Sequence, residues 1–357
     1  MKRREKYRLV SNNQKLIGFF AVIAAVFSAG CQSLNYYTQA AAGQAGLMWN
    51  SRPIVEVIHD PATSPHLKDR LLLISDIRAF AERDLSLPAS GSYQRYTDIG
   101  REFVLWSLVA AEEFSVAPEL FCFPIVGCMS YLGFFEEGSA RDEAARLRAK
   151  GLEVVVGPVA AYSTLGWFSD PVLSSVLDFP DTELAGLIFH ELAHERLFIK
   201  DDSTFNESFA SFVEREGVAK WLREQGREAD VKQYAKQLAK RDQLIDLIQN
   251  AREKLKILYA GGISNNQKRL HKSYIFDDLK KSYQLLRDAG KAPNWDYWFK
   301  QNLNNAGLIS VGTYFDQLGF FEQLFDDSRQ DFDMFYKNVE IMGKGGRITS
   351  DLRFDSG

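Results

Sequence analysis

The segment that most constrains this chain is a nearly all-apolar stretch at 184–193 that nevertheless contains His190 and Glu191. Pro180 lies just before it, and the pattern predicts a helix over about 181–198. A helix that is apolar on most sides has to be buried. Because burying polar side chains without partners is costly, the two polar residues are expected to have a specific role.

His190, Glu191 and His194 together form an HExxH motif. The two histidines are one helical turn apart, so both imidazoles lie on one face and could bind the same tetrahedral zinc ion. Glu191 lies about 100° further round the helix, where its carboxylate could act as general base toward a zinc-bound water. The motif therefore predicts hydrolysis that depends on one zinc ion.

A third protein ligand is needed, and the best candidate is Glu207, thirteen residues after His194. We expect Asn206 or Ser203 to cap a helix that has Glu207 in its first turn and Glu214 two turns along. Glu214, with Asn206 beside the ligand, is predicted to support the site by accepting a hydrogen bond from a ligand imidazole. Two histidines and one glutamate leave a coordination position open, which is the pattern of catalytic zinc.

The simpler alternative is that HExxH holds two ordinary helical histidines. Against it, two of only five histidines fall in the motif, its flanks are apolar, and a carboxylate-bearing helix follows. The other three histidines have polar or loop-like surroundings and are expected at the surface: His59, His66 and His271.

The N-terminus has the organisation of a signal peptide. Six basic residues precede an apolar run at 16–27, which ends in small residues before Cys31. The run is shorter than the roughly twenty residues that span a bilayer. The junction resembles a lipoprotein signal peptidase site, so we expect residues 1–30 to be removed and Cys31 to be lipidated. Ordinary secretion and an uncleaved anchor are the alternatives.

Lipidation would attach the protein to a membrane of the bacterial cell envelope. Gln32 follows the cysteine, and the resemblance to bacterial lipoproteins implies sorting to the outer membrane, facing the periplasm. The formal net charge is −4 and no basic stripe with interleaved aromatics is present, so nucleic acid is not an expected partner.

With 357 residues, the chain could form one large domain or two modest ones. Residues 31–50 are small and polar and are interpreted as a tether or a first helix, and 51–357 as one domain with a helical C-terminal part at about 218–345. A strand is predicted at 152–156. Helices are predicted at 64–84, 97–114, 139–150, 206–260, 272–289 and 315–341. The fold class is therefore α+β and mostly α.

Cys122 and Cys128 flank a short Pro/Gly turn. They could close a disulfide in an oxidising compartment or be two buried thiols. Metal binding by this pair is not expected, because the spacing differs from that of zinc sites.

Three segments carry a family resemblance: AYSTLGWFSDP at 161–171, FHELAHE at 189–195 and NESFA at 206–210. They resemble the bacterial predicted aminopeptidases, and the similarity extends over nearly the whole mature chain. It implies a gluzincin-like fold with a short sheet before the HExxH helix. It also implies His190, His194 and Glu207 as zinc ligands and Glu191 as catalytic base. Leu132 departs from the family, which has arginine there.

The resulting expectation is an aminopeptidase that acts on peptide or protein substrates. The alternatives are an envelope endopeptidase and a non-catalytic zinc-binding scaffold, the latter disfavoured because a structural site would not need Glu191. Tyr162, or else Tyr314, could donate a hydrogen bond to the oxyanion. The substrate could extend along 154–159. Its α-amine would need an acidic residue, for which the candidates are Glu136, Glu137 and Glu214.

Overall fold

The computed structural model describes residues 36–123, 127–162, 164, 169–301 and 303–344. The predicted signal peptide and Cys31 lie outside these residues. Two units are distinguished, 1–46 and 47–357, and residues 36–49 are helical. No helix among the described residues combines the length and apolar character needed to cross a membrane.

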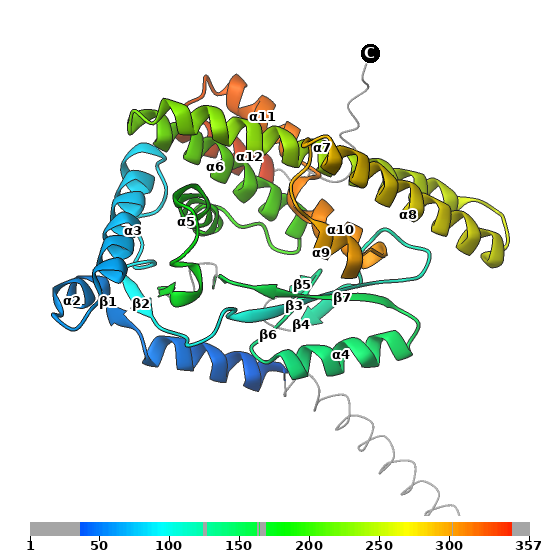
Figure 1. The fold of residues 1–357 in the computed structure, drawn as a ribbon, viewed down its shortest axis with the longest axis horizontal. Coiled ribbons are helices and arrows are strands. Elements are labelled where there is room, and N and C mark those ends of the chain that lie inside the picture. Colours follow the sequence, from blue (N-terminus) through cyan, green and yellow to red (C-terminus); the bar gives the residue numbers. More distant parts are fainter. Residues whose placement is uncertain (1–35, 124–126, 163, 165–168, 302, 345–357) are drawn as a thin grey trace, which may run out of the picture. The chain divides into compact units, whose positions relative to one another are not determined.

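The second unit is mostly helical, with small sheets (Figure 1). Its strands are β1 (Arg52–Pro53), β2 (Arg95–Thr97), β3 (Leu105–Ala111), β4 (Phe121–Phe123), β5 (Gly127–Met129), β6 (Leu132–Phe134), β7 (Glu153–Val159) and β8 (Val172–Leu173). Its helices are α2 (Ile54–His59), α3 (Pro65–Asp84), α4 (Glu137–Ala149), α5 (Asp181–Arg196), α6 (Ser203–Glu224), α7 (Glu228–Ala260), α8 (Asn265–Asp288), α9 (Asp296–Gln301), α10 (Asn305–Phe315), α11 (Leu318–Asp327) and α12 (Phe332–Lys344).

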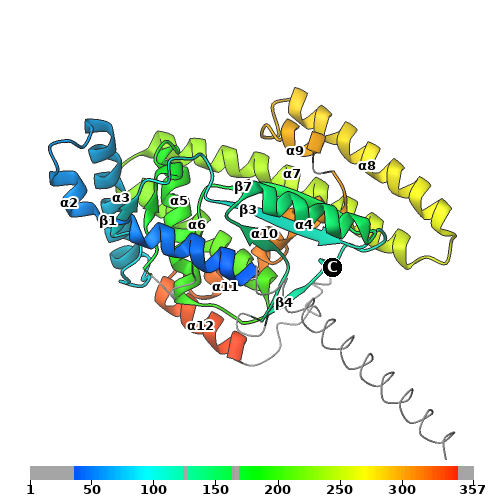
Figure 2. The same cartoon turned by 90° about the horizontal axis from the view of Figure 1, so that it is seen from below.

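The largest strand pairings form an antiparallel sheet in the order β6-β3-β7. Helix α4 packs on one face of this sheet and α10 on the other (Figures 1 and 2). On the α10 face, Ala306 and Ile309 contact a buried cluster that includes Val109 and its partner Val155. α10 thus packs against the end of β3 that contains Val109.

The main core lies between the helices, with α5 packed along α6. Phe205, Phe209 and Phe212 recur at helical spacing on α6 and are buried. They pack against aromatic residues of the last two helices, such as Phe321 of α11 and Phe335 of α12. This packing fixes the helix pair that carries the polar residues discussed below.

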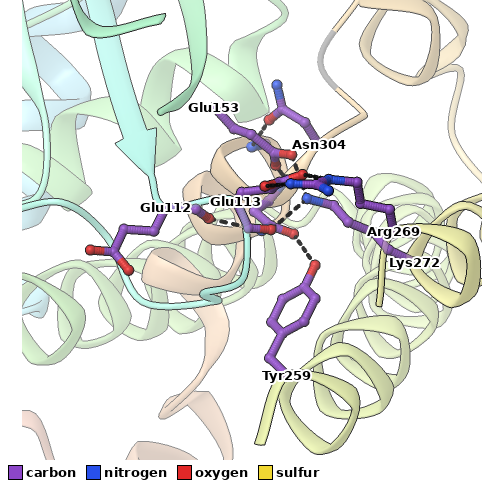
Figure 3. A network of polar contacts seen from close by, with 9 residues as sticks. Glu112, Glu113, Glu153, Tyr259, Arg269, Lys272 and Asn304 are labelled. Atoms are coloured by element: carbon purple, nitrogen blue, oxygen red, sulfur yellow. Dashed lines mark hydrogen bonds and ion pairs between the residues drawn. The ribbon is translucent and has the colours of Figure 1, made fainter. Parts of the chain in front are cut away.

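A polar network joins the sheet to the C-terminal helices (Figure 3). Lys272 of α8 is buried and forms an ion pair with Glu153 of β7. The second oxygen of Glu153 accepts from the backbone N–H of Asn305, at 2.8 Å. Tyr259 of α7 donates to the side-chain oxygen of Asn305, also at 2.8 Å. The first residue of α10 is therefore held against both the sheet and the α7–α8 pair.

Most of the predicted elements are confirmed. The region 64–84 contains α3, and the regions 139–150 and 272–289 overlap α4 and α8, which begin earlier, at Glu137 and Asn265. The predicted strand at 152–156 overlaps β7. The region 206–260 is helical with an interruption between α6 and α7, where Gly226 has φ of 66°. The fold is α+β and mostly α.

Two predictions about secondary structure are wrong. Region 97–114 is not helical, because β3 lies there and pairs with β6 on one side and β7 on the other. These partners are distant in sequence, and a short apolar run is compatible with either structure until they are known. Region 315–341 is divided into α11 and α12 by Arg329 and Gln330, both at positive φ. Helices α9 and α10 are additional.

Cys122 and Cys128, for which the sequence allows either a disulfide or two buried thiols, are joined by a disulfide. Cys122 and Cys128 face each other in the register of β4 and β5. Asp201, in the connection between α5 and α6, accepts a hydrogen bond of 2.8 Å from the backbone N–H of Cys128. The disulfide-linked hairpin is thus fastened to the segment that connects the HExxH helix with the next one.

Candidate metal centre

Helix α5 presents the two motif histidines toward α6. It begins after Pro180, and Asp181 in its first turn forms an ion pair of 2.8 Å with Arg70. His190 and His194 lie near its C-terminal end and are 9% and 5% exposed. The apolar flanks seen in the sequence are the faces that α5 buries against the core, so the two imidazoles are enclosed with them.

Helix α6 supplies the carboxylates, and its start differs from the prediction. Asp202 is the N-cap and accepts from the backbone N–H of Phe205 at 3.0 Å. Asn206 instead bonds both the N–H and the carbonyl of Ile199, at 2.8 and 2.7 Å. The helix begins at Ser203, so Glu207 lies in its second turn and not in its first. Asn206 fixes the incoming chain beside it.

The three predicted ligands are brought together by this helix pair. His190 Nε2 lies 3.2 Å from Glu207 Oε2 and 3.2 Å from His194 Nε2. The third side of the triangle, from His194 Nε2 to Glu207 Oε2, measures 3.5 Å. These buried nitrogen and oxygen atoms form a possible three-residue metal site, and no other such group occurs among the described residues.

Glu214 contacts the other nitrogen of His190, with 3.3 Å between His190 Nδ1 and Glu214 Oε2. Its second oxygen lies 3.6 Å from the guanidinium of Arg241 on α7. Gly186 of α5 leaves room for this carboxylate, because a Cβ there would lie 3.1 Å from the Cγ of Glu214. Glu214 therefore lies where an acceptor behind the ring of His190 is expected.

The histidines and carboxylates of the site shift one another's pKa. Burial by itself lowers the pKa of the His190 imidazole, but hydrogen bonds to Glu207 and Glu214 outweigh it and raise that pKa to about 10. Burial likewise raises the pKa of Glu207, yet the charge of His194 and the hydrogen bond to His190 bring it well below its usual range. The donor set is thus arranged to hold a positive charge, which is the electrostatic requirement of a cation site.

Glu191 has a different environment from Glu207. Burial is the largest effect on it and raises the pKa of its carboxyl above the usual value. It borders the same cavity as His190, His194 and Glu207, a space of about 180 Å³. A raised pKa next to a cavity is typical of a proton-transferring group.

Both tyrosines considered for the oxyanion line this cavity. The ring of Tyr314 lies 6.1 Å from the ring of His190, and the charge of Glu207 raises the pKa of Tyr314 well above its usual value. Tyr162 instead packs edge-to-face on Phe135, with 6.0 Å between ring centres. Tyr314, from α10, is therefore better placed toward the histidines than Tyr162.

None of the three candidates for amine recognition lines the cavity. Glu214 is turned toward His190 and Arg241. Glu136 is exposed, and Glu137 forms an ion pair with Arg141 on α4. A larger depression of about 760 Å³ lies between the loop at 114–117 and α7, and it contains none of the predicted site residues.

Several residues that line the cavity are not among the site residues predicted from the sequence; they include Ser107, Tyr131 and Gly133. Ser107 was hidden because its segment was interpreted as a helix. The sequence signal for a strand is the mostly apolar run at 103–111, which is bounded by Glu102 and Glu112 and is short enough for a strand. The three remaining histidines are exposed, as expected.

A family model described as "Putative aminopeptidase" matches residues 35–349. The chain belongs to this aminopeptidase family. The matched region contains α5, α6, α10 and the whole candidate metal centre. No curated protein and no solved structure matches the chain. The geometry of the candidate metal centre is therefore the basis for the residue roles proposed for this chain.

Proposed function

We propose that this protein is a zinc-dependent peptidase of gluzincin type. The observation that carries the proposal is the triangle of His190 Nε2, His194 Nε2 and Glu207 Oε2, with sides of 3.2, 3.2 and 3.5 Å. Ligand atoms about 2.0–2.2 Å from a tetrahedral zinc ion lie about 3.3–3.6 Å apart, so these three atoms fit one face of the coordination tetrahedron.

Zinc held by this face would polarise the scissile carbonyl and lower the pKa of the attacking water. The protein's own groups have separate tasks. Glu191 receives the proton of that water and passes it to the leaving amine. Tyr314 donates a hydrogen bond to the carbonyl oxygen as negative charge develops on it. Glu214 keeps the ring of His190 in the orientation that directs Nε2 toward the metal.

The family name suggests an aminopeptidase, and N-terminal trimming is our first candidate. An endopeptidase is the second candidate, and one observation favours it. Among the described residues that line the cavity, the only carboxylates are Glu191 and Glu207, which already have roles as base and ligand. Recognition of a substrate α-amine would need a further acidic group.

A matched pair of peptides distinguishes the two candidates. One has a free N-terminus, and the other has the same sequence with an acetylated N-terminus. An aminopeptidase cleaves only the first and removes single residues in order. An endopeptidase cleaves both at the same internal bonds. Mass spectrometry of the products separates these outcomes, and loss of cleavage with a zinc chelator tests the requirement for metal.

The location is proposed from the sequence alone. We propose that Cys31 carries a lipid that holds the catalytic domain on the outer membrane, facing the periplasm. Cys31→Ser should abolish incorporation of labelled fatty acid and remove the protein from the outer-membrane fraction. A variant that still incorporates fatty acid and still sediments with outer membranes would contradict the proposed anchor.

A further inference from the structure

One face of the β6-β3-β7 sheet forms a wall of the cavity. Cross-strand partners on an antiparallel sheet lie on the same face, so the register places Gly133, Ser107 and Gly157 in one row across the three strands. We call this row the sheet trough. The rows on either side have larger side chains: Leu105 with Val159, and Val109 with Val155. The middle of this face is therefore lower than its two borders.

The backbone does not account for the two glycines of the sheet trough. Neither has the positive φ that would require glycine. A Cβ on Gly157 would meet no described atom within 4 Å, and one on Gly133 would make an ordinary contact of 3.6 Å with Leu105. Glycine inside a strand costs about 0.5–1 kcal/mol relative to alanine. A glycine inside a strand often marks a bulge, a tight bend, or the close approach of a ligand or another backbone.

A second, independent observation points to a ligand at the same place. Ser107, Gly133, Leu105 and Val109 line the cavity that also contains His190, Glu191, His194 and Glu207. The three residues of the candidate metal site line this cavity together with Ser107 and Gly133, so a molecule that fills the cavity contacts both the metal site and the sheet trough.

The chemistry of the wall indicates which part of a substrate fits there. The sheet contributes aliphatic groups from Leu105, Val109 and Val159 and one small hydroxyl from Ser107. Apart from Glu191, Glu207 and the two histidines, no charged side chain lines the cavity among the described residues. A charged substrate side chain against the sheet would lose its hydration without an oppositely charged partner on this wall.

We propose that the sheet trough is the specificity pocket for a bulky apolar side chain next to the scissile bond. This inference rests on the proposed function, because it assigns a substrate class to the same cavity. Ser107 lies in the middle of the row, so its side chain sets the depth of the pocket. A difference of one methylene in such pockets typically changes kcat/KM by about 10–200-fold.

A graded series at this position provides the test: Ser107→Gly, Ser107→Ala and Ser107→Val. Hydrolysis of otherwise identical peptides with Ala, Leu or Phe beside the cleaved bond gives a Phe/Ala ratio of kcat/KM for each protein. We expect Ser107→Val to lower this ratio at least tenfold and Ser107→Gly to raise it. The matched control is Ser273→Val on the exposed surface of α8, where the ratio should equal that of the wild type.

A binding measurement separates failure of the pocket from failure of the proposed function. Calorimetry with zinc-loaded protein compares phenylalanine hydroxamate and alanine hydroxamate, which differ only by a phenyl ring. The pocket predicts tighter binding of the phenylalanine compound and loss of that preference in Ser107→Val. If the phenylalanine compound binds more tightly and Ser107→Val loses that preference while no peptide is cleaved, the proposed pocket is supported and the proposed peptidase activity is wrong. If peptides are cleaved while both preferences are unchanged in the series, or neither hydroxamate binds, the pocket is wrong.

Discussion

Glu214 Oε2 lies 3.3 Å from His190 Nδ1, on the opposite side of the ring from the nitrogen that faces His194 and Glu207. This contact fixes both the orientation of the ring and the nitrogen that is available to a metal. A carboxylate behind a ligand imidazole also makes the imidazole a stronger donor.

Replacing Glu214 should therefore weaken zinc binding without removing a ligand. We expect Glu214→Ala to lower zinc affinity about 10–100-fold, the usual effect of losing such a partner. Glu214→Gln retains an acceptor oxygen and should recover part of the loss. Competition with a chromogenic chelator measures the affinities. Glu224→Ala, exposed at the end of the same helix, serves as control; equal affinities for all four proteins would contradict the role of Glu214.

The positions of the two tyrosines predict unequal effects on catalysis. Tyr314→Phe removes the hydroxyl of the tyrosine whose ring lies 6.1 Å from that of His190, and it should lower kcat about 100-fold, the usual effect of losing one oxyanion donor. Tyr162→Phe should change kcat less than threefold, because that ring packs on Phe135. Steady-state kinetics of both variants tests this. A larger loss of kcat in Tyr162→Phe would indicate that Tyr162 is the hydrogen-bond donor to the oxyanion.

The ion pair of Lys272 and Glu153 predicts a large effect on stability. Lys272 is 8% exposed, and removing one partner of a buried pair typically costs about 3–5 kcal/mol. We expect Lys272→Met to lower the free energy of unfolding by about 3 kcal/mol in urea titrations. Lys280→Met, on the exposed surface of the same helix, should change it by less than about 0.5 kcal/mol. Equal changes in the free energy of unfolding for both variants would show that the ion pair of Lys272 and Glu153 does not stabilise the packing of α8.

Glu113 predicts a specific dependence of stability on pH. Its two oxygens accept from Arg269 at 2.6 and 2.9 Å, and this hydrogen bonding lowers the pKa of Glu113 below its reference value of 4.5. The resulting stabilisation is complete above pH 4.5 and disappears as the pH falls through the lowered pKa. The wild type should therefore lose more unfolding free energy between pH 6 and pH 3 than Arg269→Met does. Equal losses of unfolding free energy in the two proteins would contradict the lowered pKa of Glu113.

The site was more predictable than the sheet beside it. The approach of His190 and His194 to each other follows from helical spacing, which is local information, and the position of Glu207 follows from a second helix close in sequence. β3 was misinterpreted because its identity depends on β6 and β7, which are distant in the chain. The choice of Asp202 over Asn206 as N-cap depends on how the loop folds back, since Asn206 is occupied by Ile199. The family resemblance named the ligands, but it did not indicate the sheet trough.

The central claim is that zinc held by His190, His194 and Glu207 works with Glu191 as general base. Glu191→Gln tests it most directly, because the change removes the base while keeping the size of the side chain and leaving all three ligands. Zinc content by mass spectrometry and peptide hydrolysis are measured on the same preparation. We predict one zinc ion per chain, as in the wild type, and hydrolysis reduced at least 1,000-fold. Hydrolysis at the wild-type rate by the zinc-loaded variant would contradict the account.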